Sequence, residues 1–222
     1  MDESAFRLNI SSRETALLRG ERDEIVYLHS DAGSAEAVFG LLSRPRPTLI
    51  ALSADWSAEL SPWEAKKAFR AGEDFTGKAP EYLRFLVSEL IPAAESALGF
   101  TPEKRYIAGY SLAGLFAVWA QYKTNLFDGF ASVSGSLWYD GFTEFTDENE
   151  PLRKAQKAYF SLGDREKKTK NARLSTVEDA SRAAAERFSS LGAKTVFELN
   201  AGGHFNDSEA RIAKGIDWLM NA

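Results

Sequence analysis

Short apolar runs alternate along this chain with longer segments that have helical periodicity. The runs are rich in aliphatic and aromatic residues, which predicts buried β-strands. The expected strands are Glu24–His29, Thr48–Leu52, Arg105–Gly109, Gly129–Val133, Ala158–Leu162 and Thr195–Leu199. A weaker pattern over Phe6–Leu18 predicts an antiparallel edge. Strands that alternate with helices are typical of a mostly parallel sheet covered on both faces, a three-layer α/β/α sandwich.

Four segments between these strands are predicted to be helices, because their apolar residues recur at helical spacing. They are Pro80–Ala97, Leu112–Tyr122, Thr176–Ser190 and Asp207–Leu219. Pro92 is expected to kink the first helix or to start a new turn, and Gly192 suits the end of the third. Residues 53–78 have no clear period, which predicts a pocket-forming loop with about one turn of helix.

Length and composition favour one folded domain over residues 1–222. The 222 residues, 44% hydrophobic and 27% charged, can bury a sizeable core but are too few for two ordinary enzyme domains. The formal charge is −5, without the basic excess that phosphate binding needs, so we expect no nucleic-acid partner. With no cysteine, and two histidines far apart in sequence, we expect neither a disulfide nor a metal site.

The first residues and the hydropathy of the chain bear on its location. Met1 to Ser4 lack the basic start and apolar stretch of a secretory signal. No segment approaches the roughly 20 consecutive apolar residues that span a bilayer. We therefore expect a cytoplasmic protein without a membrane partner.

The stretch G-Y-S-L-A-G at Gly109–Gly114 joins a predicted strand directly to an apolar helix. A nucleophilic serine on such a sharp turn needs small residues two positions to either side, and Gly109 and Ala113 fill those positions. The start of a helix also favours developing negative charge. We predict that Ser111 is the nucleophile of a serine hydrolase. An ordinary strand–helix corner with a capping serine is the alternative.

The position of His204 makes it the expected general base. Hydrolases of this type have the chain order serine, acid, histidine. His204 follows the last predicted strand and precedes the last helix, and Gly202 and Gly203 allow its loop to approach other backbone closely. The alternative is a loop histidine without a catalytic role.

A carboxylate must orient the imidazole, and the loop after strand Ala158–Leu162 offers two. Glu166 has the spacing after Gly163 that many such hydrolases show. Asp164 has a shorter side chain that suits a turn cap. We prefer Glu166, and Asp164 stays open as the alternative acid.

An oxyanion hole needs backbone N–H donors from two loops. The N–H of Leu112, the residue after the nucleophile, is the first expected donor. The second is expected from Asp31, or failing that from Ser30, in the loop after Glu24–His29. His29 is interpreted as a structural residue at the end of its strand. The aromatic residues expected to line the substrate pocket are Tyr110, Trp138 and Trp56.

These stretches resemble the α/β-hydrolase superfamily, and within it the branch of esterase D and enterochelin-esterase-like hydrolases. The matching segments are V-Y-L-H-S-D-A-G at Val26–Gly33, E-L-S-P at Glu59–Pro62, E-L-I-P at Glu89–Pro92, G-Y-S-L-A-G at Gly109–Gly114, S-G-S-L-W at Ser134–Trp138, F-S-L-G-D-R-E at Phe160–Glu166 and G-G-H-F at Gly202–Phe205. The resemblance implies an α/β-hydrolase fold and ester hydrolysis without a cofactor. The chain is short for this family, which predicts a minimal fold without a lid domain. It also implies a triad of Ser111, His204 and Glu166. The chain departs from the family pattern at Ala113 and Ser30, which stand where glycines are usual.

We therefore expect a serine carboxylic-ester hydrolase that cleaves a small-molecule ester through an acyl-enzyme on Ser111. Two alternatives stay open at this stage. One is a thioester, peptide or carbohydrate-ester hydrolase on the same scaffold. The other is a binding protein that keeps the fold without catalysis.

Overall fold

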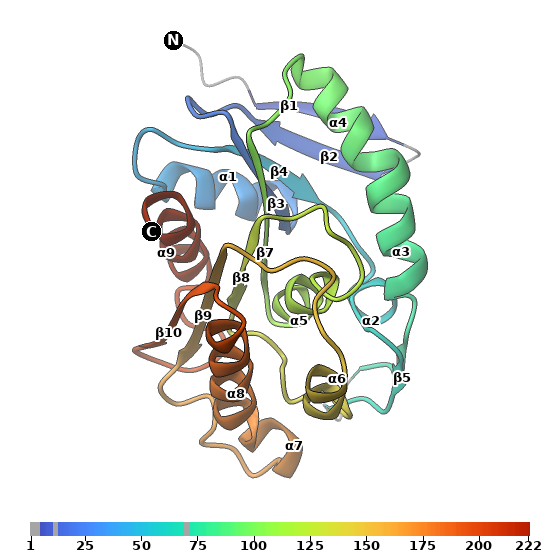
Figure 1. Cartoon of the computed structure of the whole chain (residues 1–222), viewed down its shortest axis with the longest axis vertical. Helices are drawn as coiled ribbons and strands as arrows, with labels where there is room; N and C mark the ends of the chain where they lie inside the picture. The colour runs from blue at the N-terminus through green and yellow to red at the C-terminus, as the bar shows by residue number, and fades with distance from the viewer. Residues whose placement is uncertain (1–4, 11–12, 69–71) are drawn as a thin grey trace.

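An eight-stranded sheet dominates the computed structural model, which describes residues 5–10, 13–68 and 72–222 (Figure 1). The strand order is β1-β2-β4-β3-β7-β8-β9-β10. β2 pairs antiparallel with β1 and with β4, and the other neighbours are parallel. The strands are β1 (Ala5–Ile10), β2 (Arg13–Leu18), β3 (Glu24–His29), β4 (Thr48–Leu52), β7 (Lys104–Tyr110), β8 (Gly129–Val133), β9 (Lys157–Gly163) and β10 (Lys194–Asn200).

All six strands expected from the apolar runs occur. β3, β4 and β8 have the predicted bounds, whereas β7, β9 and β10 extend one residue further at each end. The predicted antiparallel edge is the β1–β2 ladder. The mostly parallel α/β fold expected from the sequence is therefore confirmed.

Helices pack on both faces of the sheet (Figure 1). α1 (Ala32–Leu41) and α9 (Ser208–Asn221) pack on one face and enclose one hydrophobic core. On the other face lies a second core under α3 (Ala79–Phe85), α4 (Ile91–Leu98), α5 (Leu112–Ala120) and α8 (Val177–Ser190). The remaining elements are α2 (Trp56–Glu59), β5 (Glu64–Ala65), β6 (Phe75–Thr76), the π-helical turn η1 (Leu86–Leu90), α6 (Phe142–Glu148) and α7 (Ala172–Ser175).

The two cores explain why the strand sequences are continuous apolar runs. Successive side chains of a strand point to opposite faces of the sheet. In β3, Ile25 and Tyr27 belong to the core under α5, whereas Val26 and Leu28 belong to the core under α1 and α9. Because both faces are covered, both sets of side chains are mostly apolar.

The helices depart from the predicted pattern in two places. The segment predicted over Pro80–Ala97 is one continuous run of α3, η1 and α4, with Pro92 as the second residue of α4. Pro92 has no N–H to donate, so the regular helical bonding is interrupted where the π-helical turn meets α4. α1 replaces part of a predicted loop. Its N-cap is Asp31, whose carboxylate accepts from the N–H of Ser34 at 3.0 Å.

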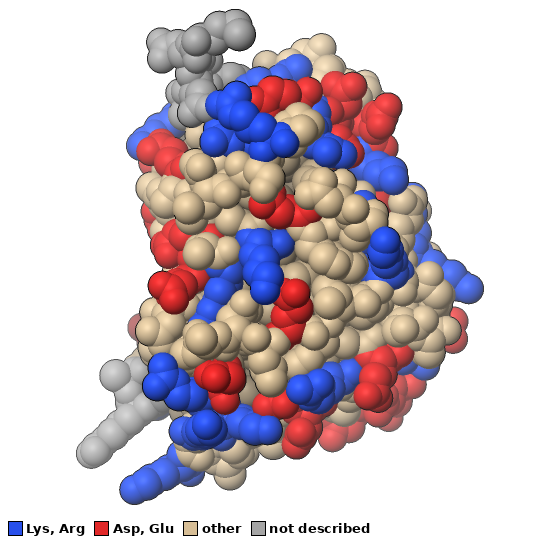
Figure 2. All heavy atoms as spheres, turned by 90° about the vertical axis from the view of Figure 1, so that its left-hand side faces the viewer, with Lys and Arg blue, Asp and Glu red and all other residues tan. Residues whose placement is uncertain are grey.

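Charges of both signs are mixed on the side of the molecule where α1 and α9 lie. Figure 2 shows Lys and Arg interspersed with Asp and Glu over this side, as the small net charge leads one to expect. In the described part of the chain, no helix combines the length and the apolar character needed to cross a bilayer.

Candidate active site

Ser111 stands at the turn between β7 and α5. Its backbone has φ 57° and ψ −121°, a conformation that residues other than glycine rarely adopt. Its N–H donates to the carbonyl of Val133 in β8 at 3.1 Å, and its carbonyl accepts from the N–H of Leu115 in α5 at 3.0 Å. The sheet and the helix therefore both hold the strained residue in place.

Small residues flank the serine because the turn brings two backbone segments together. A Cβ on Gly109 would lie 2.4 Å from the carbonyl carbon of Ala113 and 2.5 Å from its Cβ. Position 109 therefore requires glycine. The methyl group of Ala113 fits because Gly109 has no side chain, so this departure from the usual motif leaves the turn intact.

We expect Gly109→Ala to lower the free energy of unfolding by about 3 kcal/mol, because an added methyl group has no space beside Ala113. Ala113→Gly is the matched control, and we expect it to cost about 1 kcal/mol or less, the helix propensity of alanine. Urea unfolding followed by circular dichroism measures both changes. A Gly109→Ala chain as stable as the wild type would contradict the close packing.

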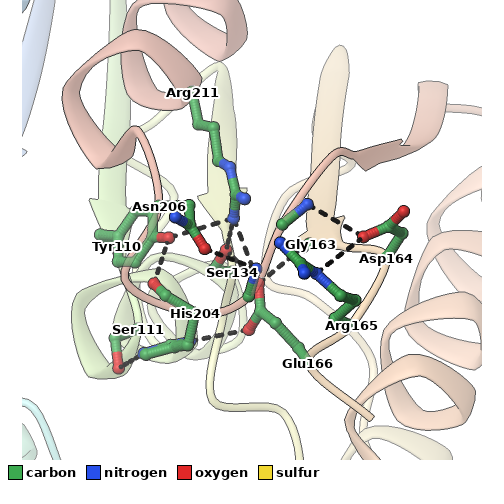
Figure 3. A network of polar contacts seen from close by, with 12 residues as sticks. Tyr110, Ser111, Ser134, Gly163, Asp164, Arg165, Glu166, His204, Asn206 and Arg211 are labelled. Atoms are coloured by element: carbon green, nitrogen blue, oxygen red, sulfur yellow. Dashed lines mark hydrogen bonds and ion pairs between the residues drawn. The ribbon is translucent and has the colours of Figure 1, made fainter. Parts of the chain in front are cut away.

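His204 lies between Ser111 and Glu166 (Figure 3). Its Nε2 is 3.1 Å from Ser111 Oγ, and its Nδ1 is 2.7 Å from Glu166 Oε2. The carbonyl of His204 accepts from the hydroxyl of Tyr110 at 2.6 Å. The side chain of Asn206 closes the loop by accepting from the N–H of Gly203 at 2.8 Å. The imidazole is therefore fixed by its own ring contacts and by its backbone.

Glu166 is held by donors on both of its oxygens. While Oε2 faces His204, Oε1 accepts from Ser134 Oγ at 2.7 Å and from the N–H of Gly163 at 2.6 Å. Burial of the carboxyl, whose side chain is 4% exposed, raises its pKa. The hydrogen bonds from His204, Ser134 and Gly163 outweigh burial and hold the pKa of Glu166 below its ordinary value. Glu166 is therefore ionised at neutral pH.

The alternative acid, Asp164, has a different place. Its Oδ1 accepts from the N–H of Gly202 at 2.9 Å (Figure 3). Asp164 thus ties the loop after β9 to the loop that carries His204, while Glu166 contacts the imidazole itself. The longer side chain is the one that reaches the ring.

Two residues of this network, Ser134 and Arg211, were missed in the sequence. Arg211, on α9, is 3% exposed, and its Nη1 lies 3.4 Å from Glu166 Oε1 and 3.3 Å from both Ser134 Oγ and the hydroxyl of Tyr110. Its Nη2 donates to the carbonyl of Ala201 at 2.9 Å. A single arginine on the buried face of the last helix was the signal that could have identified it. Ser134 gave no comparable signal, since its φ of 47° appears only in the structure.

The two expected oxyanion donors are placed by different elements. Leu112 is the first residue of α5, so its N–H lies at a free helix N-terminus beside Ser111. Asp31 follows β3, which pairs in parallel with β7 through His29 and Gly109, two residues before Asp31 and Ser111 respectively. The Asp31 carboxylate is bound to the start of α1, so it caps that helix. The roles of both N–H groups remain predictions.

A hollow of about 240 Å³ opens beside Ser111 and His204, and Trp138 lines it as expected. The structure corrects the other two pocket predictions. Tyr110 is buried behind His204, where its hydroxyl binds the His204 carbonyl. Trp56 lies on α2, 41% exposed, and is absent from the described lining of this hollow and of a second hollow of about 150 Å³ at Ser111. A wider hollow of about 580 Å³ near α3 contains none of the triad side chains.

His29 is a buried structural residue, as the sequence indicated. It is 2% exposed, its Nε2 lies 3.1 Å from the hydroxyl of Tyr82, and its ring packs edge-on against Phe116. Burial lowers the pKa of His29 to about 3, so the ring is neutral. Within the described residues, no three His, Cys, Asp or Glu side chains are grouped so as to hold a metal ion.

Comparison with solved structures places the fold among serine hydrolases and siderophore hydrolases. An IroE-like serine hydrolase from Shewanella oneidensis superposes with a TM-score of 0.72 at 18% identity, covering 99% of this chain and 80% of that one. The siderophore hydrolase EstA from Aspergillus nidulans gives 0.70 at 17% identity, covering 98% and 94%. The enterobactin esterase FES from Shigella flexneri gives 0.70 at 16% identity, covering 100% and 60%. At these identities the likeness establishes the shared fold.

Sequence comparison extends the relationship. The uncharacterized protein YbbA of Bacillus subtilis (strain 168) is 29% identical over 117 residues, which cover 51% of this chain and 47% of YbbA, about half of each. The family described as "Putative esterase" matches residues 46–206, well over half of the chain and all of the triad candidates. By that match, and with a fold that its solved neighbours share, the chain belongs to this esterase family of α/β-hydrolases.

Proposed function

We propose that this protein hydrolyses small-molecule carboxylic esters through an acyl-enzyme on Ser111. The observation that carries the proposal is the continuous chain of contacts from Ser111 Oγ to His204 Nε2 at 3.1 Å and from His204 Nδ1 to Glu166 Oε2 at 2.7 Å. These distances are within hydrogen-bonding reach, as a nucleophile and its base require. Membership of an esterase family supports the same chemistry.

Each side chain has a defined part in the proposed reaction. An ionised Glu166 accepts the Nδ1–H of His204, which leaves the Nε2 lone pair toward Ser111. As Ser111 Oγ attacks the ester carbonyl, its proton moves to His204 Nε2, and Glu166 stabilises the resulting imidazolium. The N–H of Leu112 at the start of α5 donates to the oxyanion. The imidazolium then protonates the leaving alcohol, and the acyl group stays on Ser111.

Water completes the cycle. His204 takes a proton from the attacking water, the acyl–Oγ bond breaks, and Ser111 recovers its hydroxyl proton from the imidazolium. Ser136 Oγ lies 3.2 Å from Ser111 Oγ, and either hydroxyl can donate to the other. This contact orients the nucleophile but supplies no base, since a serine hydroxyl is not basic at neutral pH.

A fluorophosphonate probe tests the proposal directly. Ser111 Oγ attacks phosphorus, fluoride leaves, and a stable phosphonyl-serine forms. We expect the label on the tryptic peptide that holds Ser111, and none on a chain denatured before the probe is added. A native chain that stays unlabelled and hydrolyses no ester would overturn the proposal and favour a binding protein. Label on Ser136 instead would identify Ser136 as the nucleophile.

The pH dependence of kcat/KM should contain one acid limb, from His204. Because the pKa of Glu166 is lowered, its stabilising contacts are complete above about pH 4.3, its usual unfolded value, and are lost as the pH falls through the lowered pKa. The acid limb should therefore come from protonation of the imidazole, the base of the proposed reaction. Initial rates from pH 5 to 9, with circular dichroism at each pH, measure this. A profile of kcat/KM that is flat from pH 5 to 9 would show that His204 is not the general base.

A further inference from the structure

Phe205 is exposed beside the reacting groups. Its side chain is 88% exposed, more than any other large hydrophobic residue in the described part of the chain. Its ring lies edge-on to His204, with 5.1 Å between centroids and 87° between planes. A single exposed apolar side chain is ordinary on a protein surface, so the location of this ring at the reacting groups matters more than its exposure. Its position next to the imidazole places the ring where a substrate bound at Ser111 can cover it.

The hollow beside His204 has apolar walls that match this ring. Its volume is about 240 Å³, and Phe205, Trp138, Leu174 and Val177 are among its lining residues. A dry cavity of about 150 Å³ holds benzene, so this space can hold a phenyl-sized group together with a short linker. Ser111 and His204 lie at the same hollow, so a group bound there is within reach of the nucleophile.

Trp138 forms a preorganised wall of this hollow. Its indole is 9% exposed, and the guanidinium of Arg173 lies over the ring at 5.4 Å from the centroid. Arg173 itself is anchored through Nη1, which donates to the carbonyl of Lys66 at 2.8 Å. A wall fixed in this way loses little freedom when a ligand binds.

The chemistry of the triad assigns this hollow to one part of the ester. The leaving alcohol oxygen must receive its proton from His204 Nε2, so the alcohol lies on the His204 side of the reacting carbon. The oxyanion lies toward the N–H of Leu112, and Leu112 lines the second hollow, not the one beside His204. The alcohol and the hollow with Phe205 are therefore on the same side of Ser111.

We propose that the hollow between Phe205 and Trp138 binds the alcohol portion of the ester, and that it takes an apolar alcohol that carries an aromatic ring. This inference rests on the proposed function, because it needs acyl transfer at Ser111. It adds the substrate class: selectivity for the alcohol is set by Phe205, and selectivity for the acyl group is set elsewhere.

Two pairs of esters separate the alcohol from the acyl group. Ethyl acetate and 2-phenylethyl acetate differ in the alcohol, whereas ethyl acetate and ethyl 3-phenylpropanoate differ in the acyl group. Both alcohols are unactivated primary alcohols, so intrinsic reactivity stays similar within each pair. We expect the ratio of kcat/KM for 2-phenylethyl acetate over ethyl acetate to fall about tenfold in Phe205→Ala, as loss of one aromatic contact predicts. The ratio for the acyl pair should change less than twofold.

Leu152→Ala is the matched control, since Leu152 is also an exposed apolar residue, at 64%, and is not among the described residues lining the hollow. It should leave every ester rate unchanged. Phe205→Tyr should keep the wild-type ratio. If Phe205→Ala changes the acyl ratio instead, the hollow holds the acyl group and the inference is overturned. An unchanged alcohol ratio overturns it as well.

The acyl-enzyme gives a second measurement. Ethyl acetate serves as the acetyl donor, and 2-phenylethyl alcohol is added as an acceptor. The acetyl group on Ser111 then passes either to this alcohol or to water. Phe205→Ala should lower the share that reaches 2-phenylethyl alcohol about tenfold, since acceptor and leaving alcohols use the same hollow. An equal share in both chains would contradict the assignment. If the wild type cleaves no ester and takes no fluorophosphonate, the proposed function has failed and the inference falls with it; turnover without alcohol selectivity overturns the inference alone.

Discussion

Ser111→Ala should lower kcat/KM for ester hydrolysis by about 10³- to 10⁶-fold, because Ser111 is the nucleophile of the proposed acyl-enzyme. The fold should survive, since the backbone contacts of residue 111 with Val133 and Leu115 do not involve the hydroxyl. Initial rates on a p-nitrophenyl ester, with circular dichroism for the fold, measure the two effects. Ser136→Ala removes a hydroxyl only 3.2 Å away and is the matched control, expected to cost less than about tenfold.

The same position also links activity to stability. At φ 57° and ψ −121°, a residue with a Cβ carries roughly 1–3 kcal/mol of strain, and glycine does not. Glycine loses about 0.5–1 kcal/mol more conformational entropy on folding. We therefore expect Ser111→Gly to be inactive and about 1 kcal/mol more stable than Ser111→Ala. A glycine variant less stable than the alanine variant would show that the turn is not strained.

The strands could be predicted from the sequence because a parallel sheet buried on both faces leaves no ambiguity in its apolar runs. That Ser111, Glu166 and His204 lie close together could be predicted for a related reason. The carboxyl ends of parallel strands meet at one edge of the sheet, so the loops after β7, β9 and β10 lie close together.

Other parts of the site depend on side-chain directions that a linear pattern does not contain. Tyr110 and Trp56 were expected in the pocket as aromatics near the site, yet one lies behind His204 and the other on α2. Asp31 precedes Ser34 by three positions, which is the spacing of a helix cap. Glycines at 33 and 40 weaken the helical pattern of the segment that follows, so α1 was not predicted there.

Arg211→Met should lower the free energy of unfolding by about 3 kcal/mol. A buried pair that loses one partner typically costs 3–5 kcal/mol, and the lower end applies because Glu166 keeps the donors Ser134, Gly163 and His204. The loop that carries His204 also loses its contact from Arg211 to the carbonyl of Ala201. Urea unfolding at pH 7 measures the stability. A decrease of less than 1 kcal/mol in the free energy of unfolding would show that the guanidinium contributes little to stability.

The same variant should move the acid limb of kcat/KM to higher pH. Glu166 faces two cationic partners when His204 is protonated, the imidazolium and the guanidinium of Arg211. The other charged groups near this loop, Asp164 and Arg165, are unchanged in the variant. Without the guanidinium one positive charge fewer opposes the imidazolium, so the limb should move to higher pH.

Arg211→Lys keeps the positive charge and loses the planar fork, which makes it the matched control. Its acid limb should stay close to that of the wild type because the charge is kept, while its plateau falls as the contact to the carbonyl of Ala201 is weakened. Rates from pH 5 to 9 for the three chains separate the two roles of Arg211. If Arg211→Met lowers the plateau and leaves the limb in place, the arginine supports the loop without acting electrostatically on the imidazole. If Arg211→Lys moves the acid limb as far as Arg211→Met does, a positive charge at residue 211 is not enough, and the limb depends on the exact place of the guanidinium.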